Sequence, residues 1–302
     1  KRCEEFLQSF PDHLVRGLRK RESRQDMPDL TNVPRRSRGQ EVRSLVFSTL
    51  AVTAVAMLVF FFQLERQPHF VDESAYFSQS FYFDLWSSGN WNDPSWLEYP
   101  AYDLPPLPKY LIGASLQLIG LPRPGVGDAR AWYSNTAFRS PRETSAALVA
   151  ARVPSALLGS VGCAAVFLVG HAAGGLACGW ISALLLMCNP LYYMHARRAM
   201  SDVPAEAFLL LAVALLLPIF RSQWSGVGVS ASLVRWILGV GILGGLAVLS
   251  KLNGLLAFIS AGAMLVVLLW APRRSWRGKW LAVSGWTASL AVGFMLQFAM
   301  NP

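Results

Sequence analysis

Apolar residues occur in one long run near the start of the chain and in several runs through its second half. Each run approaches the roughly 20 residues that an α-helix needs to cross the hydrocarbon core of a bilayer. We expect about seven membrane-spanning helices, at residues 44–64, 148–170, 176–196, 204–220, 234–250, 253–271 and 280–300. The pattern therefore predicts an all-α fold, a polytopic transmembrane helical bundle.

A long polar and aromatic segment, residues 65–147, separates the first two apolar runs. In Ser74–Trp86 large apolar side chains recur at helical spacing, which predicts a helix lying in the membrane interface. Leu107–Gly120 is apolar but too short to span, so we predict a surface or re-entrant helix. Residues 65–147 are thus expected to form a long first extracytoplasmic loop that carries interfacial helices.

Composition supports a membrane protein. The chain is 53% hydrophobic with a mean hydropathy of +0.36, which is unusual for a soluble domain. Residues 1–43 hold 11 of the 27 Lys and Arg residues, and Arg and Lys outnumber the acids there by four in a chain whose net charge is +9. A basic run beside a span is typical of a cytoplasmic tail that contacts anionic lipid, and we favour this over nucleic-acid binding. We expect a basic cytoplasmic tail at 1–43 and a membrane module at 44–302, continuing beyond residue 302 in a longer protein.

Basic residues in short loops orient this module, because such loops face the cytoplasm. If Leu107–Gly120 does not cross the membrane, six basic loop residues lie on the same side as the tail: Arg221, Arg235, Arg273, Arg274, Arg277 and Lys279. If this segment crosses the membrane, only three basic loop residues lie on the side of the tail: Arg197, Arg198 and Lys251. The non-crossing arrangement is therefore favoured.

Cysteine labelling tests this topology. We expect residues 125 and 200 outside the cytoplasm, and residues 20 and 276 inside it. An impermeant thiol reagent should label Gly125→Cys and not Gly278→Cys in intact cells, each in a chain without its 4 native cysteines. Permeabilised cells, in which both variants should react, provide the control. Labelling of Gly278→Cys alone in intact cells would overturn the topology.

Under this topology, charged residues gather at the outer membrane face. They are the carboxylates Asp72, Glu73 and Asp202 and the cations Lys109, Arg152, Arg197, Arg198 and Lys251. Acids are otherwise scarce, since only Asp202 and Glu206 follow Glu143, and we interpret Glu206 as a surface acid that offsets the helix dipole. Carboxylates can deprotonate a nucleophile and cations can stabilise a phosphate leaving group. The set suits group transfer from a lipid-linked phosphate.

Each candidate also has a structural interpretation. Asp72 and Glu73 could cap the helix that follows them, and Asp202 could cap the next span. Lys109 and Arg152 could extend to lipid headgroups.

An ordered series of motifs runs through residues 44–271. It comprises Asp72-Glu73, Ser88-Gly89-Asn90-Trp91, Pro105-Pro106-Leu107-Pro108-Lys109, Arg152-Val153-Pro154, Asn189-Pro190, Arg197/Arg198, Ser201-Asp202 and Ser250-Lys251. In the order and spacing of these motifs, the chain resembles GT-C glycosyltransferases of the protein O-mannosyltransferase and lipid A aminoarabinose transferase type. Two positions depart from the mannosyltransferases, where a histidine stands in place of Leu104 and a glycine in place of Pro108.

The resemblance implies an inverting glycosyltransferase that moves a sugar from a polyprenyl-phosphate donor to a protein, lipid or glycan acceptor. The implied roles are catalysis for Asp72 and Glu73, donor-phosphate binding for Lys109, Arg152 and Lys251, and substrate-site lining for Asp202, Arg197 and Arg198. No metal site is evident, and a divalent cation, Mg or Mn, stays open as a cofactor. The protein is expected in the bilayer, in the plasma (inner) membrane if bacterial, with no nucleic-acid partner.

Two other classes stay open at this point. A transporter or flippase of a lipid-linked solute would carry charges along a mid-membrane path, usually on broken helices in paired repeats. The charges here cluster at one face and no internal repeat is visible, which weighs against transport. A non-catalytic scaffold would keep its full function after Asp72→Asn.

Overall fold

The computed structural model describes residues 38–134, 145–224, 231–270 and 276–300. Secondary structure in these ranges is entirely helical, which confirms the all-α prediction. Residues 1–37 of the predicted basic tail and Arg273 and Arg274 of the last basic loop lie outside the described residues.

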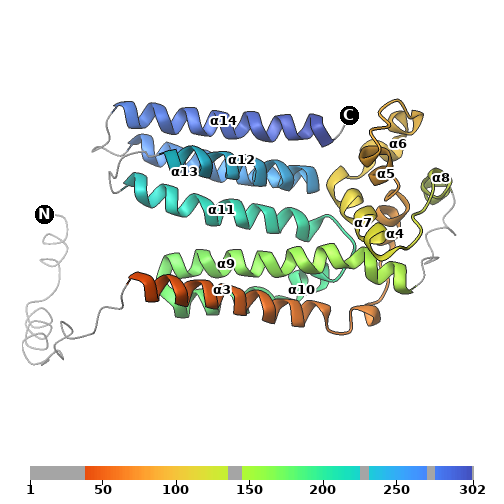
Figure 1. Cartoon of the computed structure of the whole chain (residues 1–302), viewed down its shortest axis with the longest axis horizontal. Coiled ribbons are helices and arrows are strands. Elements are labelled where there is room, and N and C mark those ends of the chain that lie inside the picture. The colour runs from red at the N-terminus through yellow and green to blue at the C-terminus, as the bar shows by residue number, and fades with distance from the viewer. Residues whose placement is uncertain (1–37, 135–144, 225–230, 271–275, 301–302) are drawn as a thin grey trace, which may run out of the picture. The chain divides into compact units, whose positions relative to one another are not determined.

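Six long helices provide the frame. From residue 45 onward, these helices lie side by side (Figure 1). They are α3 (Arg38–Phe61), α9 (Ser145–Met187), α11 (Asp202–Trp224), α12 (Ala231–Ser250), α13 (Leu256–Trp270) and α14 (Trp276–Met300). Shorter helices join them: η2 (Leu64–Arg66), α4 (Val71–Ser78), α5 (Tyr82–Ser87), η3 (Pro94–Leu97), α6 (Tyr99–Asp103), α7 (Pro106–Ile119), α8 (Val126–Ser134), α10 (Pro190–Ala196) and η5 (Leu252–Leu255). Helices α4 to α8 gather at one end of the bundle (Figure 1).

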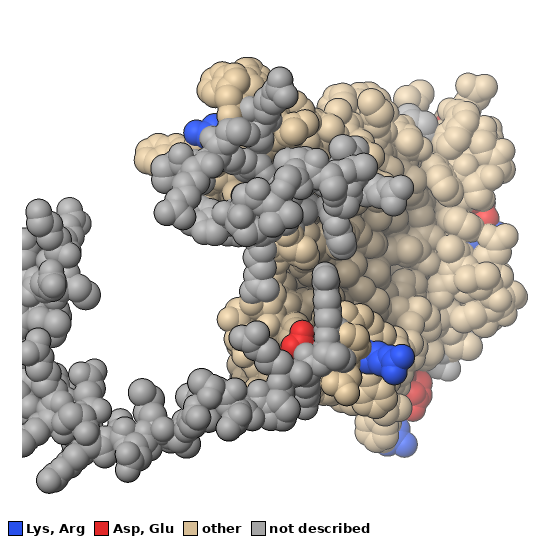
Figure 2. Space-filling view, turned by 60° about the vertical axis from the view of Figure 1, so that its left-hand side comes forward, with Lys and Arg blue, Asp and Glu red and all other residues tan. Residues whose placement is uncertain are grey.

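Every predicted span overlaps a helix. Four helices in the described ranges are long and apolar enough to cross a membrane: Gly39–Phe61, Ala146–Met187, Leu252–Trp270 and Lys279–Met300. Helix α12 adds a shorter apolar stretch, Ile237–Ser250. The exposed faces of these helices are apolar, with Phe47 and Leu58 each 74% exposed. Figure 2 likewise shows a face on which few of the described side chains are charged. Both observations suit contact with lipid.

Helix α9 contains a sharp turn at Gly174-Gly175. Gly175 has a φ of 79°, a left-handed conformation that glycine adopts without steric strain. The chain then folds back, so that the rings of Phe167 and Trp180 lie 5.9 Å apart. α9 is therefore a helical hairpin that holds the second predicted span and the beginning of the third.

The prediction of one continuous helix over 176–196 is wrong. The helix ends at Met187, and α10 begins at Pro190. Proline has no N–H for the preceding turn but fits the first turn of a new helix. The Asn189 side chain caps that helix by accepting a hydrogen bond from the Tyr192 N–H at 3.0 Å.

The predicted helix Ser74–Trp86 is likewise interrupted, between α4 and α5. Gln79 and Ser80 at the break are fully buried. The apolar stripe of this segment packs against protein, because Phe81 is buried in a cluster with Tyr82 and Trp96. Helix α7 confirms the predicted helix at Leu107–Gly120, and it ends at Gly120, whose φ is 73°.

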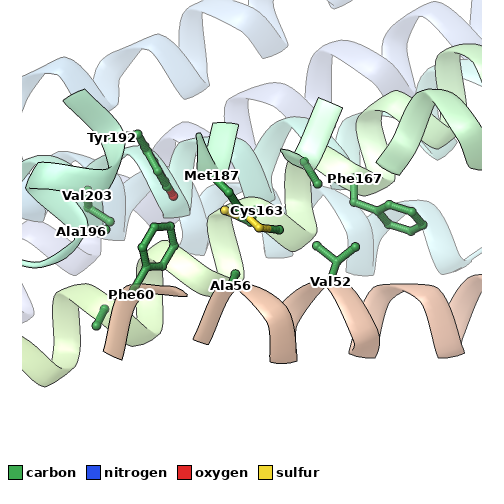
Figure 3. Close-up of a cluster of buried hydrophobic side chains, with 11 residues drawn as sticks. Val52, Ala56, Phe60, Cys163, Phe167, Met187, Tyr192, Ala196 and Val203 are labelled. Carbon is green, nitrogen blue, oxygen red and sulfur yellow. The ribbon is translucent and has the colours of Figure 1, made fainter. Parts of the chain in front are cut away.

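Helix α3 packs against α9 and α10 through the largest apolar cluster. Phe60 lies against Tyr192, with ring centroids 5.9 Å apart (Figure 3). The hydroxyl of Tyr192 donates to the carbonyl oxygen of Gly159 at 2.9 Å. The contact between Phe60 and Tyr192 places the end of α3 beside α10. The chain segments that follow these two helices both lead into the charged site.

Candidate functional site

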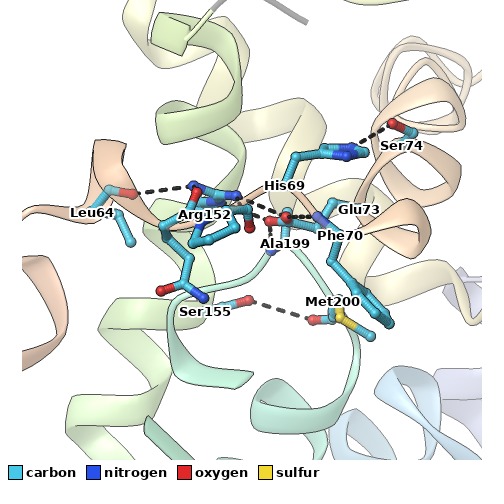
Figure 4. Close-up of polar contacts among 11 residues, drawn as sticks. Leu64, His69, Phe70, Glu73, Ser74, Arg152, Ser155, Ala199 and Met200 are labelled. Carbon is cyan, nitrogen blue, oxygen red and sulfur yellow. Dashed lines mark hydrogen bonds and ion pairs between the residues drawn. The ribbon is translucent and has the colours of Figure 1, made fainter. Parts of the chain in front are cut away.

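A fully buried ion pair between Glu73 and Arg152 lies at the centre of the site (Figure 4). Arg152 Nε donates to Glu73 Oε1, and Arg152 Nη2 donates to Glu73 Oε2, both at 2.8 Å. This is the bidentate geometry in which arginine and carboxylate bind most strongly. Helix α9 supplies the arginine and the first turn of α4 supplies the acid, so the pair joins segments 79 residues apart.

The other donors of Arg152 go to the chain that leaves α3. Its Nη1 donates to the carbonyls of Leu64 at 3.1 Å and Gln67 at 2.9 Å, and its Nη2 also donates to that of Pro68 at 3.3 Å. A guanidinium has five N–H groups. The two hydrogen bonds to Glu73 and the three to these backbone carbonyls together occupy all of them. The geometry therefore gives Arg152 a positioning role and leaves no donor for the phosphate contact predicted from the sequence.

Glu73 also organises two backbone segments. Its Oε2 accepts the N–H of Phe70 at 3.0 Å, which caps α4, and its Oε1 accepts the N–H of Ala199 at 2.9 Å (Figure 4). The carboxylate thus ties the loop after α10 to the start of α4. Its four hydrogen bonds make Glu73 a positioning residue for the neighbouring Asp72 and Arg198.

Arg197 reinforces the same junction. It is buried and donates to the carbonyls of Phe62 at 2.8 Å and Gln63 at 2.7 Å, and to the Tyr193 hydroxyl. Gln63 has a φ of 52°, so the chain bends sharply as it leaves α3. Arg197 satisfies the carbonyls exposed by that bend, and the structure assigns it to the scaffold of the site.

Arg198 is different. Its guanidinium lies over the ring of Phe70, 4.3 Å from the ring centroid, and the side chain is half-buried. Within the described ranges no side chain or backbone carbonyl accepts a hydrogen bond from it, and its Nε is buried without a partner. A guanidinium held in place by a ring, with its donors open, is suited to bind an anion.

Asp72 stands in the first turn of α4, next to buried Glu73. Its side chain is half-buried, and it has no hydrogen bond or ion pair with another residue that the structure describes. Helix caps usually engage a backbone N–H, and in α4 Glu73 does so instead. Asp72 therefore keeps a carboxylate without a partner among the described residues, two positions after Phe70, and its catalytic role stays a prediction.

Tyr76 connects Asp72 to a second charged group. The tyrosine is buried, and its hydroxyl is hydrogen-bonded to the side chain of Ser201. The pKa of Tyr76 is raised to about 12, mainly by burial and to a smaller extent by the negative charges of Asp202 and Asp72, while the hydrogen bond with Ser201 lowers it. Tyr76 therefore lies within electrostatic range of both carboxylates and stays protonated at neutral pH.

The second group consists of Asp202 and Lys251. Lys251 Nζ donates to Asp202 Oδ1 at 2.5 Å, and His195 Nδ1 lies 4.0 Å from Asp202 Oδ2. Lys251 comes from the link between α12 and η5, and Asp202 begins α11. The predicted phosphate contact of Lys251 would have to compete with this carboxylate.

Lys109 has different neighbours. It is almost completely buried and donates to the carbonyls of Pro100 at 2.8 Å and Ala101 at 3.1 Å in α6. Its ammonium lies 4.9 Å from the centroid of the Tyr82 ring. Burial lowers the pKa of Lys109 to about 7, against the opposing charge of Asp103. These contacts hold α6 on α7, and its predicted phosphate role stays a prediction.

A cavity of about 250 Å³ adjoins Asp202 and Lys251. Its lining includes two residues that sequence reasoning did not assign to a site, Glu206 and Asn253. The i, i+4 spacing of Asp202 and Glu206 places both on one face of α11 and was visible in the sequence. The approach of Asn253 was not visible, because it depends on the packing of η5 against α11.

Among the described residues no group of three or more His, Cys, Asp or Glu side chains is arranged to hold a metal ion. A divalent cation as cofactor stays a prediction, and no step below is assigned to a metal.

The fold is that of a polytopic helical membrane protein, and its charged side chains gather near the ends of the long helices. Both features are typical of membrane enzymes that act on lipid-linked substrates. The family model of dolichyl-phosphate-mannose-protein mannosyltransferases matches residues 50–301, and the chain belongs to this family. It is therefore a membrane mannosyltransferase that uses a polyprenyl-phosphate-mannose donor. No curated protein and no solved structure matches the chain.

Proposed function

We propose that the chain transfers mannose, with inversion, from a polyprenyl-phosphate donor to a hydroxyl group of a protein acceptor at the extracytoplasmic face. The observation that carries this proposal is the presence near Phe70 of a carboxylate and a guanidinium, each without a hydrogen-bond partner among the described residues. Asp72 and Arg198 supply these groups, and the buried Glu73–Arg152 pair fixes both of their segments.

In this mechanism Asp72 accepts the proton of the acceptor hydroxyl as its oxygen attacks the anomeric carbon of the sugar. The bond between that carbon and the phosphate oxygen breaks, and the phosphate leaves with the bonding electrons. Arg198 offsets the charge that grows on the phosphate. One displacement from the face opposite the leaving group inverts the configuration of the sugar carbon.

The test is a transfer assay with the full-length protein in detergent or vesicles. Polyprenyl-phosphate mannose and a peptide that contains Ser and Thr serve as substrates, and the linkage of the product is determined by NMR. We expect a mannosyl peptide whose anomeric configuration is opposite to that of the donor. A product with retained configuration would exclude the single displacement, and transfer to lipid or glycan alone would exclude the protein acceptor.

Arg198→Gln should weaken binding of the polyprenyl-phosphate donor by about tenfold or more. Charge-assisted hydrogen bonds contribute about 1.5–3 kcal/mol each, and 1.4 kcal/mol corresponds to tenfold in affinity. Donor affinity can be measured by titration of a fluorescent polyprenyl phosphate. Arg66→Gln is the matched control, because the Arg66 side chain is 72% exposed and only approaches Glu65 at 4.0 Å. Equal donor affinity in Arg198→Gln and wild type would reduce Arg198 to packing on Phe70.

A further inference from the structure

The cavity beside Asp202 lies between three elements of the bundle. Residues of α11, of η5, of the first turn of α13 and of the link before η5 line it, among them Asp202, Glu206, Leu209, Lys251, Asn253 and Leu256. Its volume of about 250 Å³ lies below the roughly 300–1,000 Å³ of sites for drug-sized ligands. A single monosaccharide ring is a ligand of suitable size.

Two side chains in the cavity lining, those of Glu206 and Asn253, have hydrogen-bonding groups without a partner among the described residues. Glu206 lies one turn into α11, is exposed, and forms no hydrogen bond or ion pair with any residue in the described ranges. Asn253 adds an amide, which can both donate and accept hydrogen bonds.

Charge narrows the class of ligand. Two carboxylates four residues apart on α11 face one lysine, and that lysine is already paired with Asp202. Glu206 would therefore repel a phosphate placed beside it. No group of three or more acids, His or Cys that could hold a metal ion is found among the described residues. Hydroxyl groups, which donate to carboxylates and exchange hydrogen bonds with amides, are the complementary chemistry.

Apolar groups complete the lining. Leu209 and Leu256 present aliphatic surface to the same cavity. A sugar ring has both features, since its hydroxyls lie at the edge and its C–H groups form apolar faces. Tyr76 connects the cavity to the proposed catalytic region, because it is hydrogen-bonded to Ser201, the residue before Asp202, and stands on α4 one turn after Asp72.

We propose that this cavity binds the hexosyl group of the donor, with Glu206 and Asn253 as specificity-determining residues for its hydroxyls. The inference rests on the proposed function, since it names the site of the sugar that Asp72 and Arg198 are proposed to transfer. The phosphate is then left outside the cavity, at Arg198.

Two lipids that differ only in the sugar test the proposal in the full-length protein. Glu206→Gln should weaken binding of polyprenyl-phosphate mannose by about tenfold or more, as expected for loss of a charge-assisted hydrogen bond. Binding of sugar-free polyprenyl phosphate should stay unchanged. Asn253→Ala should show the same pattern, and Glu65→Gln, which alters an exposed acid outside the cavity, should bind both lipids as wild type does.

Three outcomes would overturn the proposal. Equal losses for both lipids in Glu206→Gln would place the phosphate or the lipid chain in the cavity. Unchanged binding of both lipids with a raised KM for the peptide would place the acceptor there. Wild-type binding and kinetics in both variants would leave the cavity without a ligand role. Failure of the proposed function is a separate result, because it requires absence of mannose transfer by the wild-type protein.

Discussion

Asp72→Asn is expected to lower the turnover of mannose transfer by about 10²–10⁴-fold, the usual contribution of a general base. Asparagine has nearly the same shape as aspartate but cannot accept the proton of the acceptor hydroxyl. Donor affinity should persist, because the phosphate is proposed to bind Arg198, whose guanidinium lies over the Phe70 ring on another segment. The rate should be measured with saturating donor and acceptor, beside donor affinity and protein yield.

A capping role predicts a different result for the same variant. Asparagine caps helices as well as aspartate does, so a structural Asp72 would tolerate the change. Asp128→Asn is the matched control, since Asp128 is also an acid in the first turn of a short helix and accepts from the Gly125 N–H at 2.9 Å. Transfer at the wild-type rate by Asp72→Asn would exclude general-base catalysis by this residue.

The positions of the apolar helices could be predicted from hydropathy, although seven spans were predicted and only four described helices, with the shorter stretch in α12, have the length and composition of a span. A run of about 20 apolar residues has few stable alternatives to a membrane helix, and each predicted span overlaps an observed helix. The positions at which a helix ends and a new one begins were harder to predict from the sequence. The segment 176–196 remains apolar across Asn189-Pro190, so its mean hydropathy does not reveal the restart of the helix there.

The residues of the site could be named from the sequence, but several of their contacts could not. Glu73, Arg152 and Arg197 were candidates for their charge and position. Their partners include backbone carbonyls at the end of α3, more than 80 residues away from Arg152. Such groups occur at every residue and leave no signal in a sequence. Only the fold distinguishes an arginine that positions a loop from one that faces a ligand.

Arg152→Gln is expected to cause the largest loss of stability. Removing one partner of a buried ion pair costs about 3–5 kcal/mol, because the other charge is left buried without compensation. Here the change would leave the Glu73 carboxylate with only two backbone N–H donors and free three carbonyls of the chain after α3. Thermal unfolding of the purified protein in detergent should show a clearly lower midpoint than wild type.

The exposed pair Arg130–Glu98 provides the control, since the Arg130 side chain is 63% exposed and surface pairs contribute about 0–1 kcal/mol. Arg130→Gln should therefore unfold close to wild type. The double variant Arg152→Gln/Glu73→Gln should lose less stability than the sum of its single variants, because it leaves no unpaired charge. If Arg152→Gln instead unfolds as wild type does and loses only donor affinity, Arg152 binds the phosphate, as the resemblance implied, and the buried pair does not hold the site together.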